Sequence, residues 1–199
     1  MTVDSKNPTN LPGMPESDHD LEMDLGAFDN SSYSPGAGPV KRLLWYVTNA
    51  VVFDSWLVPA YSIKARILRW FGARVGRGLV IKPRVNIKYP WRLRIGDDVW
   101  IGEGAWIDNL GDVELADDVC LSQGAFLLTG NHDYRDPRFG LVVKGIHIER
   151  GAWVGARSTV CPGVRMARNS ILVVGSTLRS DTEPGGIYSG NPAEFVRRR

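Results

Sequence analysis

Large aliphatic residues recur at every sixth position from Val75 onward. Three short runs and one long run share this spacing, and all fifteen positions hold Val, Ile, Leu or Met. The positions are Val75, Ile81 and Ile87; Ile95, Ile101 and Ile107; Leu115, Leu121 and Leu127; and Ile148, Val154, Val160, Met166, Leu172 and Leu178. A period of six fits neither a helix nor the two-residue alternation of a strand. It predicts a short strand and a turn, repeated so that three units close one triangular coil.

The residues between these positions fit the same coil. Four places after most of the aliphatic residues stands a small or β-branched residue, such as Ala105 or Ser158, and glycine directly follows several of them, as at Gly102 and Gly155. With neighbouring strands ~4.8 Å apart, about five coils form a prism on the order of 24 Å tall. A β-sandwich of short strands would not keep so strict a spacing. We therefore expect an all-β fold, a parallel β-helix, over residues 75–199.

The repeat is interrupted at three places. The spacing grows by two residues in 87–95 and again in 107–115, which predicts small bulges at corners of the coil. In 127–148 the spacing grows to twenty-one residues. A coil cannot hold that many, so we expect residues at about 129–146 to leave the prism as a loop. Long loops on a rigid scaffold are often functional, which makes this loop the first place to look for chemistry.

A helical period precedes the repeat. Residues 40–74 contain two apolar stripes at helical spacing, in 43–52 and 63–71, with a break near Pro59. We expect two helices that pack on the prism or on a neighbouring subunit. Tryptophans and basic residues flank both stripes, and that composition equally suits contact with a membrane interface.

The first 39 residues are rich in proline, serine, glycine and asparagine, and they hold seven acids against one lysine. This composition predicts a largely disordered or extended tail over 1–39. The stretch 24–33 is the exception that we expect, because Leu25, Phe28 and Tyr33 can anchor it to a surface.

The overall composition is that of a globular protein, with 43% hydrophobic and 23% charged residues and a net charge of +2. Residues 140–199 are basic, with nine Lys and Arg against four acids, which suits an anionic ligand. Cys120 and Cys161 give neither a disulfide framework nor a metal-binding spacing, so a reduced, cytoplasmic protein without a metal is expected. No signal peptide and no apolar run of about 18 residues is present. No nucleic-acid partner is expected.

The loop opens with LLTGNHDYRDP at 127–137, which places His132 between an asparagine and an aspartate. A histidine with a pKa near 6.5 is neutral at working pH and can accept a proton. It can serve as the general base for a hydroxyl that attacks a thioester, beside a donor that stabilises the oxyanion. The non-catalytic alternative is a surface or capping histidine. His19, in the acidic tail, and His147, in a strand-like GIHIE, are weaker candidates.

Several segments together resemble the hexapeptide-repeat acyltransferases, and most of all the colanic-acid-type acetyltransferases of the maltose, galactoside and nodulation group. The segments are WIGEGAWIDN (100–109), VCLSQGAFLLTGNHDY (119–134), TGNHDYRDPRFGLVVK (129–144), GAWVGARSTVCPGV (151–164) and YSGNPAEFVRRR (188–199). The resemblance covers the chain from about Asp24 to the C-terminus. It implies a left-handed β-helix, acetyl-CoA as co-substrate, a homotrimer and a sugar acceptor.

The resemblance also assigns residues. It implies that His132 is the general base and that Asn131, Asp108 and Asn109 contact the acceptor, although Asp108 and Asn109 also suit an Asx turn at the second corner bulge. In the family, coenzyme A lies along the C-terminal coils between two subunits. The positions that match its binding residues are Ala156, Val174, Arg179, Ser180 and Arg197. The basic C-terminal third then neutralises the phosphates of the cofactor.

We therefore expect an acetyl-CoA-dependent O-acetyltransferase that acts by direct transfer on a sugar hydroxyl of an exopolysaccharide or glycolipid intermediate, free or lipid-linked. An amino-sugar N-acyltransferase and a non-catalytic β-helix scaffold remain alternatives. Peripheral contact with the inner membrane face is a further option for such an acceptor. A covalent route through Cys120 or Cys161 is disfavoured, because both stand where small residues recur for packing. A zinc-dependent carbonic anhydrase would need three histidine ligands, and the repeat region has two histidines.

Overall fold

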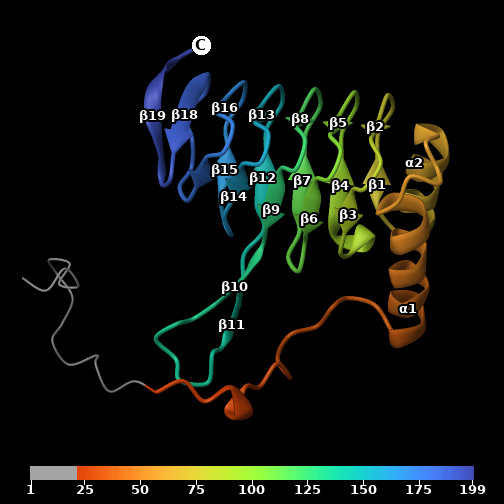
Figure 1. The fold of residues 1–199 in the computed structure, drawn as a ribbon, viewed down its shortest axis with the longest axis vertical. Helices are drawn as coiled ribbons and strands as arrows, with labels where there is room; N and C mark the ends of the chain where they lie inside the picture. Colours follow the sequence, from red (N-terminus) through yellow and green to blue (C-terminus); the bar gives the residue numbers. More distant parts are fainter. Residues whose placement is uncertain (1–21) are drawn as a thin grey trace, which may run out of the picture.

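The computed structural model describes residues 22–199 as a stack of triangular coils with helices at one end and a long loop at one side (Figure 1). The rest of the expected tail, residues 1–21 with His19, lies outside the described residues. Fifteen strands of two or three residues form the coils. They are β1 (Arg74–Val75), β2 (Val80–Ile81), β3 (Asn86–Ile87), β4 (Leu93–Ile95), β5 (Trp100–Ile101), β6 (Trp106–Asp108), β7 (Val113–Leu115), β8 (Cys120–Leu121), β9 (Phe126–Leu128), β12 (Ile146–Ile148), β13 (Trp153–Val154), β14 (Thr159–Val160), β15 (Arg165–Met166), β16 (Ile171–Leu172) and β17 (Thr177–Leu178).

Equivalent strands of successive coils pair in parallel and build three faces. The first face has the order β1-β4-β7-β12-β15, the second β2-β5-β8-β13-β16, and the third β3-β6-β9-β14-β17. A final hairpin extends the second face, with β18 (Gly186–Gly190) parallel to β16 and antiparallel to β19 (Ala193–Arg198). The fold class predicted from the sixfold pattern is confirmed: a β-solenoid of parallel coils with one extruded loop and helices ahead of it.

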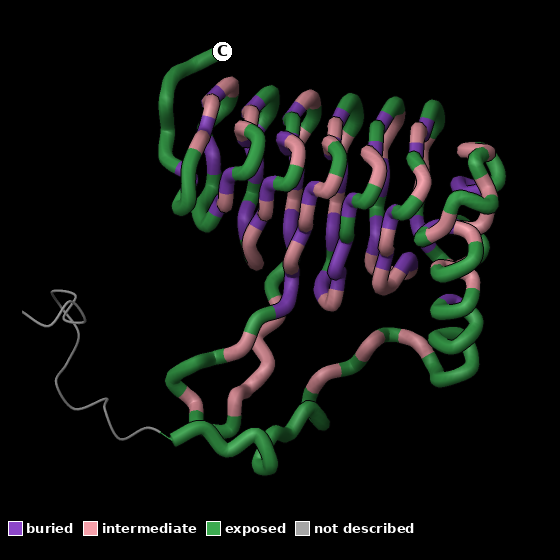
Figure 2. Tube along the Cα trace, viewed as in Figure 1, coloured by how far each residue is buried: buried purple, intermediate pink, exposed green. Residues whose placement is uncertain are grey.

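The sixfold aliphatic residues fill the centre of the prism. All of them from Ile81 to Leu178 are buried, and Val75 in the first coil is partly buried. The small or β-branched residues four places later are buried as well, and Figure 2 shows buried segments recurring in every coil. Each buried Val, Leu or Ile side chain contributes about 1.5–3 kcal/mol relative to exposure. The column of stacked aliphatic residues therefore holds the coils together.

Glycine follows several aliphatic residues because the next coil passes directly over that position. A Cβ on Gly155 would lie 2.5 Å from the carbonyl oxygen of Leu172, and a Cβ on Gly102 would lie 2.6 Å from the backbone nitrogen of Gln123. Both contacts are with backbone that has no room to move. Glycine thus permits the close approach of successive coils.

The two short interruptions lengthen the early coils. Val154 pairs with Leu172, eighteen residues on, whereas Ile81 pairs with Ile101, twenty residues on. A short 3₁₀-helix, η3 (Pro90–Arg92), takes up the first addition at a corner. The coils therefore stay in register while the extra residues project at one edge of the prism.

The helices cover the N-terminal end of the stack. α1 (Pro39–Thr48) continues into a π-helical turn, η2 (Asn49–Phe53), and α2 (Tyr61–Trp70) follows after the break around Pro59. Trp45 and Phe53 are buried against the first coil, and the Trp45 indole donates to the carbonyl of Ile87 at 2.8 Å. Of the partners expected for the first stripe, its own prism is not the one observed, because Leu43 and its neighbours are exposed. Within residues 22–199, no helix is both long and apolar enough to cross a membrane.

Candidate active site

The two ends of the extruded loop pair with each other as a β-hairpin. Its stems are β10 (Gly130–His132) and β11 (Leu141–Val143), which pair antiparallel with His132 opposite Leu141. Thr129 fixes the point where the chain leaves the prism. Its buried hydroxyl donates to the carbonyl of Asp108 at 2.8 Å and accepts from the backbone nitrogen of Gly111 at 2.9 Å. His132 therefore stands on an ordered stem.

The imidazole of His132 is held by two groups of one residue, Phe139. Nδ1 of His132 lies 2.8 Å from the carbonyl oxygen of Phe139, and the two rings stack with centroids 4.0 Å apart and planes 10° apart. A carbonyl oxygen only accepts, so Nδ1 carries the proton of the neutral imidazole and Nε2 keeps its lone pair. The backbone nitrogen of His132 donates to Oδ1 of Asn131 at 2.8 Å. The ring is thus set, in tautomer and in plane, to accept a proton at Nε2.

The turn that carries Phe139 is closed by aspartates. Oδ1 of Asp136 accepts from the backbone nitrogen of Arg138 at 3.0 Å, and Oδ1 of Asp133 accepts from the backbone nitrogen of Arg135 at 2.9 Å. The hydrogen bonds from the Arg138 backbone and side chain lower the pKa of Asp136. Asp136 therefore remains ionised, and the two side chains rigidify the tip of the loop.

The N-terminal segment, residues 22–38, runs from the extruded loop to α1. The backbone nitrogen of Asp24 donates to the carbonyl of Pro137 at 2.8 Å. The ring of Phe28 meets the imidazole of His132 edge-on, with centroids 5.7 Å apart and planes at 63°. Phe28 is thus an anchor, as the sequence indicated, whereas Leu25 is 66% exposed. The contact between Phe28 and the histidine has no signal in the sequence.

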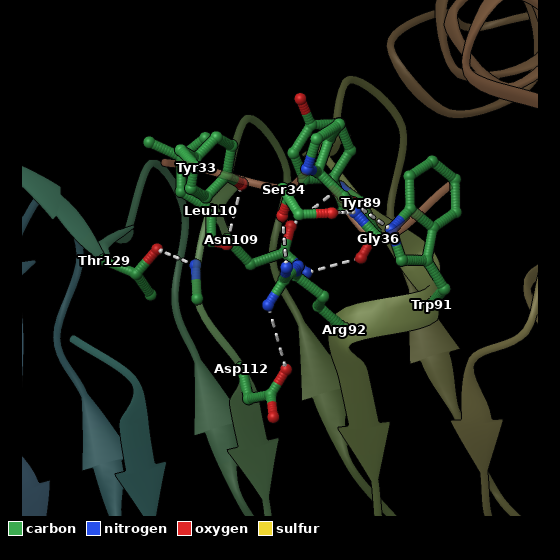
Figure 3. A network of polar contacts seen from close by, with 12 residues as sticks. Tyr33, Ser34, Gly36, Tyr89, Trp91, Arg92, Asn109, Leu110, Asp112 and Thr129 are labelled. Carbon is green, nitrogen blue, oxygen red and sulfur yellow. Dashed lines mark hydrogen bonds and ion pairs between the residues drawn. The ribbon is translucent and has the colours of Figure 1, made fainter. Parts of the chain in front are cut away.

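A second set of contacts ties this segment to the two corner bulges (Figure 3). The Tyr33 hydroxyl donates to the carbonyl of Leu110 at 2.9 Å, and the Trp91 indole donates to the carbonyl of Pro35 at 2.7 Å. The guanidinium of Arg92 lies over the Tyr33 ring, 5.9 Å from its centroid. Burial raises the pKa of Tyr33 to about 12. The Tyr33 hydroxyl therefore stays protonated and keeps its hydrogen bond at any physiological pH.

Three of the sequence-predicted residues share one hollow. Asn131, His132 and Arg179 line a space of about 630 Å³ between the hairpin and strands β14 and β17 of the third face. Lys144 and Cys161 line it too. The hollow therefore joins a proton acceptor, an exposed amide, two cations and one acid, Asp133. This set can activate a hydroxyl and attract an anionic or polarised ligand.

Asp108 and Asn109 lie at the second corner bulge, outside this hollow. Asn109 is fully buried, and its amide accepts from the backbone nitrogen of Tyr89 at 2.9 Å and donates to the carbonyl of Tyr89 at 2.6 Å. It therefore bridges two coils rather than forming an Asx turn. Asp108 is 8% exposed, and its carboxylate lies 2.9 Å from Nζ of Lys88. Of the pair, Asp108 has the side chain that is closer to solvent.

The positions matched to cofactor binding lie along the last coils. Ala156 and Val174 occupy the same corner of successive coils, where the backbone nitrogen of Gly175 donates to the carbonyl of Ala156 at 2.9 Å. Arg179 and Ser180 follow β17 at the next corner. These residues therefore stand at both ends of the β14–β17 part of the third face, beside the hollow. Arg197 lies apart from them, exposed on β19.

The thiols and the remaining histidine do not form a second centre. Burial raises the pKa of both Cys161, at the hollow, and Cys120, on β8. A raised pKa keeps a thiol protonated and weakens it as a nucleophile. His147 faces Glu114 at 3.2 Å on the first face. Among residues 22–199, no three His, Cys, Asp or Glu side chains gather closely enough to hold a metal ion.

The groups that sequence reasoning missed are Phe139, Thr129 and Lys144. Phe139 acts through its carbonyl and ring, and Thr129 through a hydroxyl buried at the exit of the loop. Backbone acceptors leave no mark on residue type, and antiparallel pairing inside an irregular loop has no period to detect. Only the break in the sixfold pattern and the resemblance of the loop segment pointed to this place.

Comparison with known proteins gives relatives that match nearly the whole chain. The protein named colanic acid biosynthesis acetyltransferase WcaF, from Escherichia coli (strain K12), is 31% identical over 177 residues, which cover 89% of this chain and 97% of the relative. No family model matches the chain.

Two solved structures share the fold over most of its length. A hexapeptide-repeat-containing acetyltransferase from Vibrio cholerae superposes with a TM-score of 0.73 at 20% identity, covering 80% of this chain and 90% of that one. A galactoside acetyltransferase in complex with coenzyme A gives a TM-score of 0.71 at 22% identity, covering 80% and 81%. At identities of 20% and 22%, these two structures show the fold alone.

Proposed function

We propose that this chain is an acetyl-CoA-dependent O-acetyltransferase, because it belongs to the same family of hexapeptide-repeat acetyltransferases as this colanic acid relative. The acceptor is a sugar hydroxyl of an exopolysaccharide or glycolipid intermediate. The relative is named for the biosynthesis of such a polysaccharide, and the galactoside enzyme was solved with coenzyme A. The resemblance carried by the hexapeptide segments agrees with both.

The observation that carries the proposal is the contact between Nδ1 of His132 and the Phe139 carbonyl at 2.8 Å. This hydrogen bond leaves the lone pair on Nε2, which accepts the proton of the acceptor hydroxyl as its oxygen attacks the thioester carbonyl. The imidazolium that forms is stabilised by the same carbonyl oxygen. It then returns the proton to the departing thiolate, so His132 ends the cycle neutral. No covalent intermediate on the chain is needed.

The cations around the hollow fit an acyl donor that carries phosphates. Lys144 and Arg179 line the hollow itself, and Arg197 adds a charge on the last hairpin. Ala156, Val174 and Ser180 provide the small or exposed positions along the same coils, where an extended cofactor can lie. Guanidinium and ammonium groups pair favourably with phosphate oxygens.

Asn131 is the acceptor-binding residue that the geometry supports best. It is exposed, it lines the hollow, and its neighbour in the chain is the proposed base. Asp108 extends the acceptor side toward the second corner bulge. The Asn109 amide is hydrogen-bonded to the backbone of Tyr89 in the neighbouring coil, so Asn109 contributes to the acceptor site only by holding that corner in place.

We also propose a homotrimer. The hollow is open on one side, and one convex prism cannot enclose a sugar and an acyl chain together. A second prism set against the hairpin would close it, and three such contacts close a ring. Light scattering on the purified full chain gives the mass directly, and a monomer that turns over normally would contradict this assembly.

The experiment that tests the function is thiol release from acetyl-CoA across free, nucleotide-linked and lipid-linked sugars. The wild type should acetylate a hydroxyl, identified by mass spectrometry of the product. His132→Ala should lose ~10²–10⁴-fold in kcat, the range for a general base, and His147→Ala should match the wild type. Turnover only with an amino sugar would favour the N-acyltransferase. If none of the sugars leads to thiol release, the non-catalytic scaffold remains as the alternative. A His132→Ala variant as active as the wild type would refute the role of His132 as the base.

A further inference from the structure

The first helix presents an apolar stripe away from its own prism. Val40, Leu43, Leu44 and Val47 follow one another at helical spacing, and Val51 continues the stripe into η2. Each is about half exposed or more, up to 70% at Val40. The opposite side of the helix carries the buried Trp45. An amphipathic helix normally turns its apolar stripe inward, whereas this stripe is left uncovered by residues 22–199.

Exposed aromatic side chains also lie in the helical segment that contains the stripe. Tyr46, Trp56 and Trp70 are 61–77% exposed, and Leu57 and Ile63 lie among them. Ten of the twenty exposed large apolar side chains within the described part of the chain fall in 40–70. Tyrosine and tryptophan are the residues enriched where one side of a ring meets lipid and the other meets water.

The charge of the same region has one sign. Lys41, Arg42, Arg66 and Arg69 are exposed on the two helices, and Asp54 is the sole acid in 40–74. Interfaces between protein copies are depleted of lysine, whereas an anionic lipid surface attracts each nearby cation by about 1 kcal/mol. Exposed apolar, aromatic and basic side chains on the same helices are the composition of helices that lie in a membrane interface.

From these observations we infer that α1, η2 and α2 form a docking face for an anionic membrane surface. The inference deepens the proposed function and rests on it, because it assigns the acceptor to the lipid-linked class. The helices lie in the interface without crossing it, with the stripe toward the acyl chains and the cations toward the phosphates.

A groove beside this face suits the head group of such an acceptor. It measures about 600 Å³, lies between α1 and β3, and is lined by Arg42, Leu43, Tyr46 and Lys88 among others. Its two cations outnumber its one acid, Asp54, and together with the apolar side chains they match a phosphate joined to a lipid. In the folded chain Lys88 Nζ lies 2.9 Å from the Asp108 carboxylate at the acceptor side of the prism.

The docking face and the catalytic hairpin are physically connected. The N-terminal segment is hydrogen-bonded to the extruded loop at Pro137 and runs directly into α1 at Pro39. In Figure 1 the extruded loop and α1 extend from the coils toward the same side. A saccharide held at the membrane by its lipid can therefore reach the hollow at His132 while the helices remain on the surface.

The test is co-sedimentation of the full-length protein with vesicles of phosphatidylcholine alone and with added phosphatidylglycerol. We expect binding to the anionic vesicles that falls as salt rises from about 0.1 M to about 1 M, since the Debye length shrinks from ~10 Å to ~3 Å. The double variant Leu44→Asp and Val47→Asp, whose residues belong to the stripe and do not line the groove, should need ~tenfold more lipid or worse for half-binding. Trp100→Asp, at an equally exposed aromatic side chain on β5, should bind like the wild type.

Two readouts separate this inference from its rivals. The double variant should keep its mass in light scattering and its rate with a soluble saccharide, and lose rate only with a lipid-linked saccharide in vesicles. If the double variant differs in mass from the wild type without lipid, the face contacts a second copy of the chain and the inference is overturned. Vesicle binding by the double variant equal to that of the wild type would overturn it as well. Vesicle binding by a wild type that acetylates no sugar would instead refute the proposed function.

Discussion

The edge of the Phe28 ring faces the imidazole of His132, with the two ring centroids 5.7 Å apart. Phe139 covers the flat side of the same imidazole and fixes its Nδ1. The ring is therefore held by two segments that come from distant parts of the sequence. Any change in the N-terminal segment is expected to reach the chemistry through this contact.

Replacing Phe28 with alanine should lower kcat by about tenfold, since an aromatic pair of this kind contributes ~0.5–1.5 kcal/mol. The loss should appear in kcat more than in the KM for acetyl-CoA, because Phe28 positions the base and lies on no cofactor position. Phe28→Tyr should restore most of the rate. Leu25→Ala, at an exposed residue of the same segment, is the control. Equal rates for Phe28→Ala and Leu25→Ala would show that the contact between the Phe28 and His132 rings does not contribute to catalysis.

Two asparagines should separate stability from acceptor binding. Asn109→Ala leaves the backbone N–H and carbonyl of Tyr89 without their partner. Losing such buried hydrogen bonds costs about 1–3 kcal/mol each, so thermal unfolding should shift down by several degrees. The acceptor KM should change little. Asn131→Ala, at an exposed residue, should do the reverse and raise the acceptor KM at unchanged stability. The opposite pattern would return Asn109 to the acceptor site.

The anchoring of the N-terminal segment should depend on alkaline pH. Burial raises the pKa of Tyr33 to about 12 in the folded chain, whereas a free phenol titrates near 10. A group whose pKa is raised on folding stabilises fully below its free pKa. The stabilisation is then lost as pH rises through the raised value, here between about 10 and about 12.

Limited proteolysis of residues 22–38 is the measurement for this anchor. Cleavage should accelerate between about pH 10 and about pH 12 in the wild type, because the phenol of the detached segment ionises at a lower pH than that of the anchored one. Tyr33→Phe loses the hydrogen bond to Leu110 and should be cleaved faster at neutral pH, with a flatter pH dependence. Tyr46→Phe, at an exposed phenol, is the control. Identical pH profiles for Tyr33→Phe and the wild type would contradict the role of the phenol.

Two glycines of the solenoid should differ in how they tolerate alanine. A Cβ on Gly155 would meet the backbone of the next coil at 2.5 Å, so Gly155→Ala should cost ~3 kcal/mol through overpacking. Gly175 has a φ of +70° and open space around its Cα, so Gly175→Ala should cost only the left-handed strain of about 1–2 kcal/mol. Urea unfolding measures both. A smaller cost at Gly155 would mean that the coils are not in tight contact there.

The site was readable from the sequence only in part. His132 and Asn131 were identified by a break in the sixfold pattern and by resemblance, and they share a hollow with Arg179. The hydrogen bonding of Asn109 could not be predicted, because its amide bonds to Tyr89 in the neighbouring coil and no local sequence pattern indicates that partner. The sequence left open whether the apolar stripe of α1 faces the prism, a neighbouring subunit or a membrane, because helical spacing shows that a stripe exists and not which side it turns to.

The sequence by itself determined the solenoid, the point where the loop leaves it and the histidine at the root of that loop. It could do so because each hexapeptide places its aliphatic residue inward by local backbone geometry, and one coil stacks on the next without long-range choices. Only the tertiary structure decided how the imidazole is held, since Phe28 and Phe139 reach His132 through an extended segment and a backbone carbonyl. Such contacts depend on how the chain returns through space, and residue order alone does not fix that.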